Sequence, residues 1–209
     1  MKKIILLLSP LLAFQLSAAP TLPKIFGDHM VLQQGRPVMV WGWAEAREKV
    51  AVSFAGQQKM AVADADGQWS VKLDALSASK EGRELKVNDK VFKDVVVGEV
   101  WVCSGQSNME WEASRVKEAD KVRAAANFPM IRHIKVPKVS APVAKDNFNG
   151  TWQVCSPQTV SRFTAVGYFF GKRLHEELDV PIGLLNSSWG GTHIEPWTPP
   201  EGWKTIQTH

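Results

Sequence analysis

The sequence predicts an α/β protein with a β-rich first part and a second part in which strands and helices alternate. Before residue 98, short apolar runs with two-residue alternation are separated by polar turns, without a helical period. From Gly98 onward, strand-like runs alternate with segments of helical period, which is typical of an open parallel sheet. We therefore expect an export signal at residues 1–19, a β-sandwich at 20–97 and a parallel α/β domain at 98–209.

The amino terminus has the features of an export signal. Lys2 and Lys3 precede an apolar core from Ile4 to Leu16, and the small residues Ser17-Ala18-Ala19 resemble a cleavage site. This apolar run is too short to remain in a bilayer, and no other stretch approaches ~20 apolar residues. We expect a periplasmic or secreted protein without a membrane span in the mature chain.

The β-rich part is expected to contain several short strands. The expected strands are Val38–Trp43, Val50–Phe54 and Trp69–Leu73, and the pattern continues over Leu85–Phe92 around a turn at Asn88-Asp89. Asp64-Ala65-Asp66-Gly67 is a hairpin signal before the third of these strands. Strands at this spacing predict a β-sandwich. No ionisable cluster lies within it, so we expect a packing platform or, as the alternative, a part that presents substrate.

The second part predicts a strand–helix–strand–helix–strand order. Strands are expected to end at Cys103 and to cover Met130–Val136 and Ile182–Asn186, with helices near Asn108–Ala126 and Phe163–Leu178. Ligands of such sheets bind beyond the carboxyl ends of the strands. Two unusual stretches, Ser104–Asn108 and Asn186–Gly191, follow strand ends of this kind.

Ser107 is the candidate nucleophile. It follows an apolar strand and Gly105, and it opens a helical segment, which is the setting in which hydrolytic α/β enzymes present a serine. The same residues also fit a capping box, in which Ser107 and Glu110 satisfy amides at a helix start. Spacing leaves both interpretations open.

Three stretches carry a resemblance to a known family. VVVGEVWVC followed by SGQSNMEW resembles the nucleophile block of the sialate O-acetylesterases, a branch of the SGNH-hydrolase superfamily. PKIFGDHMVLQQGRPVMVWGWA resembles that family's opening strands, and NSSWGGTHIEPWTP its glycine block. The resemblance implies an SGNH-type α/β/α domain and a serine esterase that removes O-acetyl groups from sialic acid or related sugars. It places the nucleophile at Ser107 and an oxyanion-hole donor at Gly190 or Gly191.

The predicted ligand is an acetylated sugar or glycan. The chain has nine tryptophans against one tyrosine, and flat indole faces suit sugar rings. We predict substrate contacts from Gln106, Asn108, Trp111 and Trp189, although a core role remains the alternative for each tryptophan. Related SGNH branches deacetylate xylan, so an acetylxylan-type esterase is also left open.

The sequence does not contain the general-base histidine block that the family resemblance implies. SGNH hydrolases carry a late Asp-x-x-His block, whereas His209 has Ile206 three residues before it. No catalytic role is assigned to the other histidines, which are His29, His133, His175 and His193. We expect an incomplete SGNH domain with little esterase activity of its own. A non-catalytic glycan-binding or remnant domain is the alternative from another class.

Charge, ligand spacing and cysteine content bear on three further questions: nucleic-acid binding, metal binding and a disulfide bond. The net charge is +4 without a basic block, so no nucleic-acid partner is expected. No residues have zinc-ligand spacing, and we predict neither metal nor cofactor. Cys103 and Cys155 would pair in an oxidising compartment if their Cα atoms lay within ~7 Å, which the sequence leaves open, as it does the oligomeric state.

Overall fold

The structure is a computed structural model that describes residues 19–203. Apart from Ala19, the predicted export signal lies outside the described residues, and so does His209. Within this range, none of the helices has the length and apolar character required to cross a membrane.

The strands are β1 (Val31–Gln33), β2 (Val38–Trp43), β3 (Lys49–Phe54), β4 (Gln57–Val62), β5 (Gln68–Leu73), β6 (Ser79–Val87), β7 (Lys90–Gly105), β8 (Phe128–Lys135), β9 (Gln153–Cys155) and β10 (Ile182–Ser188). The helices are α1 (Ser107–Glu110), α2 (Ala119–Ala124), α3 (Ala165–Leu178) and α4 (Pro200–Trp203), with 3-10 turns η1 (Ala113–Arg115), η2 (Val160–Arg162) and η3 (Glu195–Trp197).

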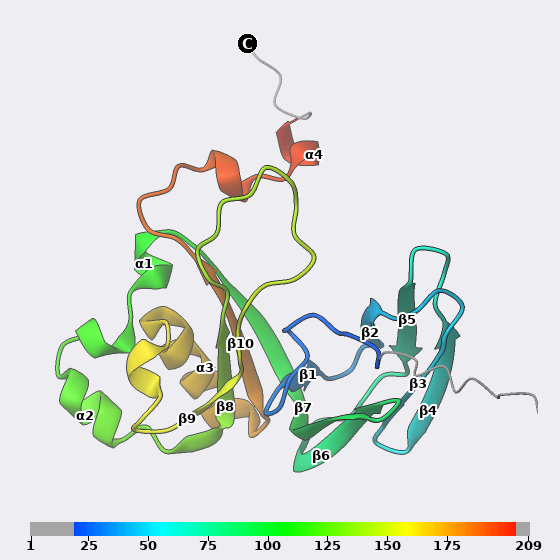
Figure 1. The fold of residues 1–209 in the computed structure, drawn as a ribbon. Helices are drawn as coiled ribbons and strands as arrows, with labels where there is room; N and C mark the ends of the chain where they lie inside the picture. Colours follow the sequence, from blue (N-terminus) through cyan, green and yellow to red (C-terminus); the bar gives the residue numbers. More distant parts are fainter. Residues whose placement is uncertain (1–18, 204–209) are drawn as a thin grey trace, which may run out of the picture.

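Strand β7 connects the two parts of the molecule. It belongs to an 8-stranded sheet of order β4-β3-β6-β7-β10-β8-β9, with β1 also beside β7. Its first half pairs with β6 and β1, and its second half pairs in parallel with β10. Figure 1 shows β7 extending from the N-terminal strands to the region of α1. The position of the residues that follow β7 therefore depends on packing in both parts.

In the N-terminal part, the separate β2–β5 pair shares one hydrophobic core with the large sheet. Val40 and Val71 pack in the same cluster as Val50, Val52 and Leu85. Strands β2, β3 and β5 confirm the predicted runs, because each buries alternate residues against this core.

The predicted hairpin at Asp64–Gly67 is wrong, although the turn itself exists. The Asp64 carboxylate accepts hydrogen bonds from the backbone N–H groups of Asp66 and Gln68, and these bonds stabilise the turn locally. Strand β4 before the turn pairs with β3, whereas β5 after it pairs with β2. The turn therefore carries the chain from one sheet to the other.

The second part confirms the predicted parallel strands and the second helix. Strand β10 lies between β7 and β8 and runs parallel to both. Helix α3 packs on β8 and β10 and buries Tyr168 in a core with Ile131, Ile182 and Leu184. The short antiparallel strand β9 beside β8 was not predicted.

The continuous helix predicted near Asn108–Ala126 is wrong. The chain forms the short helices α1 and α2, separated by extended backbone and η1. The carbonyl of Trp111 accepts the Ala165 N–H at 2.7 Å, and the Ala113 N–H donates to the Phe163 carbonyl at 2.9 Å. These bonds to the segment at the start of α3 replace the helical hydrogen bonds.

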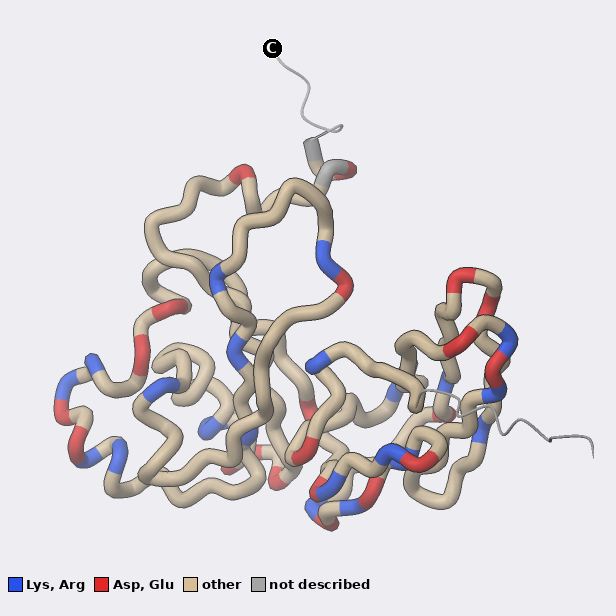
Figure 2. The backbone as a smooth tube through the Cα atoms, viewed as in Figure 1, with Lys and Arg blue, Asp and Glu red and all other residues tan. Residues whose placement is uncertain are grey.

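Charged residues of both signs are interspersed along the described backbone. Figure 2 shows Lys and Arg alternating with Asp and Glu around α2 and along the N-terminal strands. Several of these residues form exposed ion pairs, including Arg83–Glu81 and Lys121–Glu118. Such pairs contribute little to stability, so the fold depends mainly on its two apolar cores.

Candidate active site

Ser107 lies at the carboxyl end of β7, as predicted. The strand ends at Gly105, whose φ of 135° lies in a region that L side chains rarely adopt, and Ser107 is the first residue of α1. The carbonyl of Gly105 also accepts the Trp189 N–H at 2.9 Å. The Ser107 side chain is exposed at this edge and is therefore accessible to a ligand.

The structure brings Gly190 next to Ser107. A Cβ atom added to Gly190 would lie 3.2 Å from the Ser107 Cα and 3.5 Å from its Cβ. The segment Trp189–Gly191, here called the glycine loop, follows β10, which is paired with β7 up to Ser188 and Gly105. The two stretches that the sequence singled out thus meet because adjacent parallel strands end together.

Glu110 contacts the glycine loop rather than capping its own helix. Gln106 occupies the N-cap position of α1, and no side chain caps the helix. The Glu110 carboxylate accepts a hydrogen bond from the Gly190 N–H and forms an ion pair with Lys138. The capping-box interpretation of Ser107 and Glu110 is therefore wrong.

The contacts of Glu110 favour its charged form. The hydrogen bond from Lys138, followed by the one from the Gly190 amide, holds the pKa of the Glu110 carboxyl below its ordinary value of 4.5. A second ion pair lies beside it, between Lys135 and Glu112 at 2.9 Å. Glu110 is thus an anion at neutral pH.

The two glycines differ in the availability of their amides. The Gly190 N–H is occupied by Glu110, whereas no hydrogen-bond partner among residues 19–203 accepts the Gly191 N–H. Gly191 has a φ of 79°, which glycine adopts without strain. Of the two predicted oxyanion donors, Gly191 is the one with an unused amide in this structure.

Trp189 lines a cleft beside the glycine loop. The cleft has a volume of about 570 Å³ and lies between residues 136–141, after β8, and the segment after β10. Trp197 also lines it, and its indole N–H donates to the Thr192 hydroxyl at 2.8 Å. Figure 1 shows both segments at the end of the sheet that carries α1.

The other predicted contact residues are accessible but lie outside the lining of this cleft. Gln106 and Asn108 are exposed on either side of Ser107. Trp111 is 49% exposed, donates its indole N–H to the Arg115 carbonyl and lies under the Arg115 guanidinium. Sequence reasoning did not identify Glu110 and Lys138 as parts of the site, because Glu110 meets Gly190, and Lys138 meets Glu110, only through tertiary contacts.

None of the four described histidines is hydrogen-bonded to Ser107. His29 pairs with Asp94, and His175 Nδ1 lies 2.8 Å from the Val180 carbonyl. His133 stacks on Phe163, and burial lowers the pKa of His133 to about 3. His193 is exposed in the segment after the glycine loop. No group of three His, Cys, Asp or Glu residues in the described chain is arranged to hold a metal ion.

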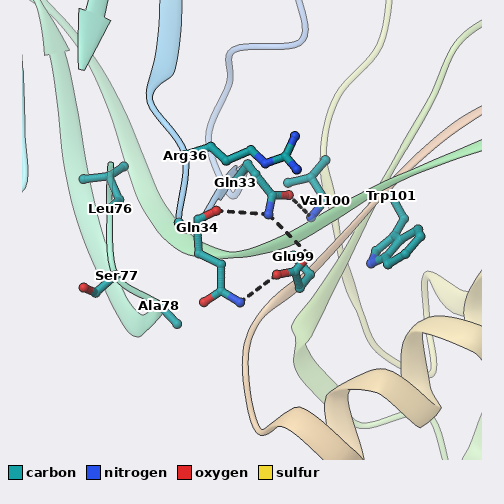
Figure 3. Close-up of a pocket in the computed structure, with 10 residues that line it drawn as sticks. Gln33, Gln34, Arg36, Leu76, Ser77, Ala78, Glu99, Val100 and Trp101 are labelled. Carbon is teal, nitrogen blue, oxygen red and sulfur yellow. Dashed lines mark hydrogen bonds between the residues drawn. The ribbon is translucent and has the colours of Figure 1, made fainter. Parts of the chain in front are cut away.

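A separate cavity of about 750 Å³ lies along the middle of β7 and contains none of the predicted site residues. Figure 3 shows Gln33, Gln34 and Glu99 hydrogen-bonded to one another there, with Arg36 and Trp101 at the periphery. The Gln34 amide donates to Glu99 at 2.7 Å, and the Gln33 side chain accepts the Val100 N–H at 2.8 Å. These contacts position β1 against β7.

Cys103 and Cys155 are both free and buried, which answers the question that the sequence left open. Burial raises the pKa of each thiol to about 11. We expect neither thiol to react appreciably with Ellman's reagent at pH 8 in the native protein, because about one thiol in a thousand would be ionised. Both should react once the protein is unfolded in guanidinium. Rapid native-state release of one equivalent of thionitrobenzoate would contradict this prediction.

Known proteins are similar to this chain in both sequence and fold. Residues 97–207 match the family described as carbohydrate esterase, sialic acid-specific acetylesterase. The sialate O-acetylesterase of Mus musculus is 29% identical over 197 residues, which cover 82% of this chain and 36% of that protein. The Homo sapiens enzyme is 28% identical over 194 residues, with 82% and 37% coverage.

A solved structure of a carbohydrate acetylesterase is similar to this chain at a higher sequence identity. It is the crystal structure of a carbohydrate acetylesterase from Xanthomonas citri, which is 39% identical with a TM-score of 0.84. The match covers 90% of this chain and 44% of that one. This chain therefore spans less than half the length of each of these similar proteins.

Proposed function

This chain belongs to the sialic acid-specific acetylesterase family of carbohydrate esterases, and we propose that it carries the nucleophile and glycine loop of a serine esterase that removes O-acetyl groups from sialic acid or related sugars. The observation that supports this most directly is the approach of Gly190 to Ser107, with 3.2 Å between an added Cβ atom and the Ser107 Cα. A hydroxyl beside bare backbone is the arrangement that acyl transfer requires.

In the proposed reaction, Ser107 Oγ attacks the carbonyl carbon of the acetyl ester while its proton passes to a base. The carbonyl oxygen becomes an oxyanion, which the backbone N–H groups of Ser107 and Gly191 stabilise. Collapse of this intermediate releases the sugar hydroxyl and leaves an acetyl-serine, which water then hydrolyses to acetate. No histidine among residues 19–203 is hydrogen-bonded to Ser107, so none of them is proposed as this base.

We propose that the sugar is held by residues around this edge of the sheet. Gln106 and Asn108 flank the nucleophile, and Trp111 and Trp189 offer indole faces nearby. The position of Trp189 in the cleft beside the glycine loop supports its assignment. We also propose that residues 20–97 serve as a β-sandwich platform, and that the protein is exported to the periplasm or secreted.

Covalent labelling tests the proposed function. We expect a fluorophosphonate to add once per chain, at Ser107, as measured by intact mass and peptide mapping. Ser107→Ala should reduce labelling below detection, whereas Ser104→Ala, a control at the neighbouring exposed serine, should leave it unchanged. Added imidazole should accelerate labelling of Ser107, because it supplies a proton acceptor. No labelling with imidazole present, or equal labelling of Ser107→Ala, would favour the non-catalytic glycan-binding alternative.

A further inference from the structure

One carboxylate connects helix α1 with two loops at the edge that carries Ser107. Glu110 belongs to α1, after β7; its partner Lys138 belongs to the loop after β8; and its partner Gly190 follows β10. These three segments are brought together only by the fold, since Gly190 lies 80 residues from Glu110 in the sequence. No other side chain among residues 19–203 hydrogen-bonds to the Gly190 amide.

We propose that Glu110 is a positioning residue, which holds the Gly190 amide so that the glycine loop lies against Ser107 and the Gly191 amide remains available to the substrate. This inference rests on the proposed function and adds a residue to its machinery. It assigns to Glu110 no contact with the substrate and no proton transfer.

The geometry explains why this contact determines the position of the loop. A Cβ atom on Gly190 would lie 2.7 Å from Glu110 Oε2, so the carboxylate and the nucleophile's backbone enclose Gly190 closely. A hydrogen bond between an ionised carboxylate and a backbone N–H is stronger than one between neutral groups. Trp189, the preceding residue, is tied to Gly105 through its own N–H. The loop is therefore fixed through the peptide N–H groups on both sides of Trp189.

The role of Lys138 is secondary. Its side chain is 40% exposed, and ion pairs at such positions contribute little free energy. Lys138 orients the Glu110 carboxylate toward Gly190 and connects it to the loop that lines the cleft beside Trp189. The hydrogen bond from the Gly190 N–H to Glu110 is here called the tether. Removal of the Lys138 charge should therefore weaken the tether without abolishing it.

Amide exchange tests the tether directly. In the full chain, we expect Glu110→Ala to accelerate hydrogen exchange of the Gly190 amide at least tenfold, as measured by NMR. Glu110→Gln should retain most of the protection, because its amide oxygen still accepts the hydrogen bond. Lys138→Met should have an intermediate effect. Glu112→Gln is the matched control, since it removes a neighbouring carboxylate that pairs with Lys135 and should leave Gly190 unchanged.

The rate of fluorophosphonate labelling, with imidazole present, tests the role in the reaction. We expect a decrease of about tenfold to a hundredfold in Glu110→Ala, because the donor is misplaced, with recovery to within about threefold in Glu110→Gln. Equal rates in wild type and Glu110→Ala, or an unchanged Gly190 exchange rate, would overturn the proposal. If wild-type Ser107 does not react at all, the proposed function fails and the reaction role of Glu110 with it, whereas amide exchange still reports whether the tether exists.

Discussion

Replacement of Gly98 by alanine is expected to destabilise the fold by about 3 kcal/mol, because the new methyl group would collide with backbone. A Cβ atom at this position would lie 2.0 Å from the Pro181 carbonyl oxygen and 2.7 Å from its carbon. No change of rotamer relieves such a contact. The same carbonyl accepts the Glu99 N–H at 2.9 Å, so a shift of Pro181 also disturbs the first bond between β7 and β10.

The measurement is urea denaturation followed by circular dichroism, with Gly27→Ala as the control. A Cβ atom at Gly27 would meet only the edge of the Trp152 ring, at 3.8 Å, which is ordinary contact. We expect the control to change the free energy of unfolding by no more than about 0.5 kcal/mol. A Gly98→Ala protein as stable as this control would show that the junction of β7 and β10 is looser than the structure indicates.

The relation between β7 and β10 also explains why the proximity of the two stretches at the candidate site was predictable. Ser107 and Gly190 each follow an apolar run that reads as a buried strand, and adjacent parallel strands end at the same edge of a sheet. Nothing beyond strand identity and parallel pairing was needed to bring them together. The second helix was predictable for a similar reason, since its apolar residues recur at helical spacing.

What the sequence did not predict depends on contacts between distant segments. The residues after Glu110 have helical spacing, yet their amides and carbonyls bond to Phe163 and Ala165, and the helix breaks. Strand β4 buries no residue, and its apolar residues Met60, Ala61 and Val62 are consecutive rather than alternating, so the sequence gives no sign of its pairing with β3. The spacing of Ser107 and Glu110 indicated a capping box, but Glu110 instead reaches Gly190, a partner that is near only in the folded chain.

The second large effect on stability is expected when Arg132 loses the carboxylate of Asp94. The Arg132 side chain is 2% exposed in β8, and its guanidinium pairs with Asp94 on β7, with Nη1 3.0 Å from Oδ2 and Nη2 3.2 Å from Oδ1. The guanidinium also donates to the backbone carbonyls of Asp94 and Pro129. Asp94→Ala would keep these carbonyl bonds but leave a buried positive charge without its counter-ion. We expect a loss of about 3 kcal/mol in the free energy of unfolding.

The pH dependence of stability provides a second test of the same contact. Burial raises the pKa of the Asp94 carboxyl, but the hydrogen bond from His29 and the charge of Arg132 together outweigh it and hold this pKa below 3.8. A carboxyl with a depressed pKa contributes stability that is present above its unfolded pKa and is lost as the pH falls through the folded value. Wild type should therefore lose stability below about pH 4, and Asp94→Asn should lose less over that interval. Parallel acid profiles of the two proteins, measured by urea denaturation, would mean that Arg132 is stabilised by its backbone carbonyl partners rather than by the Asp94 charge.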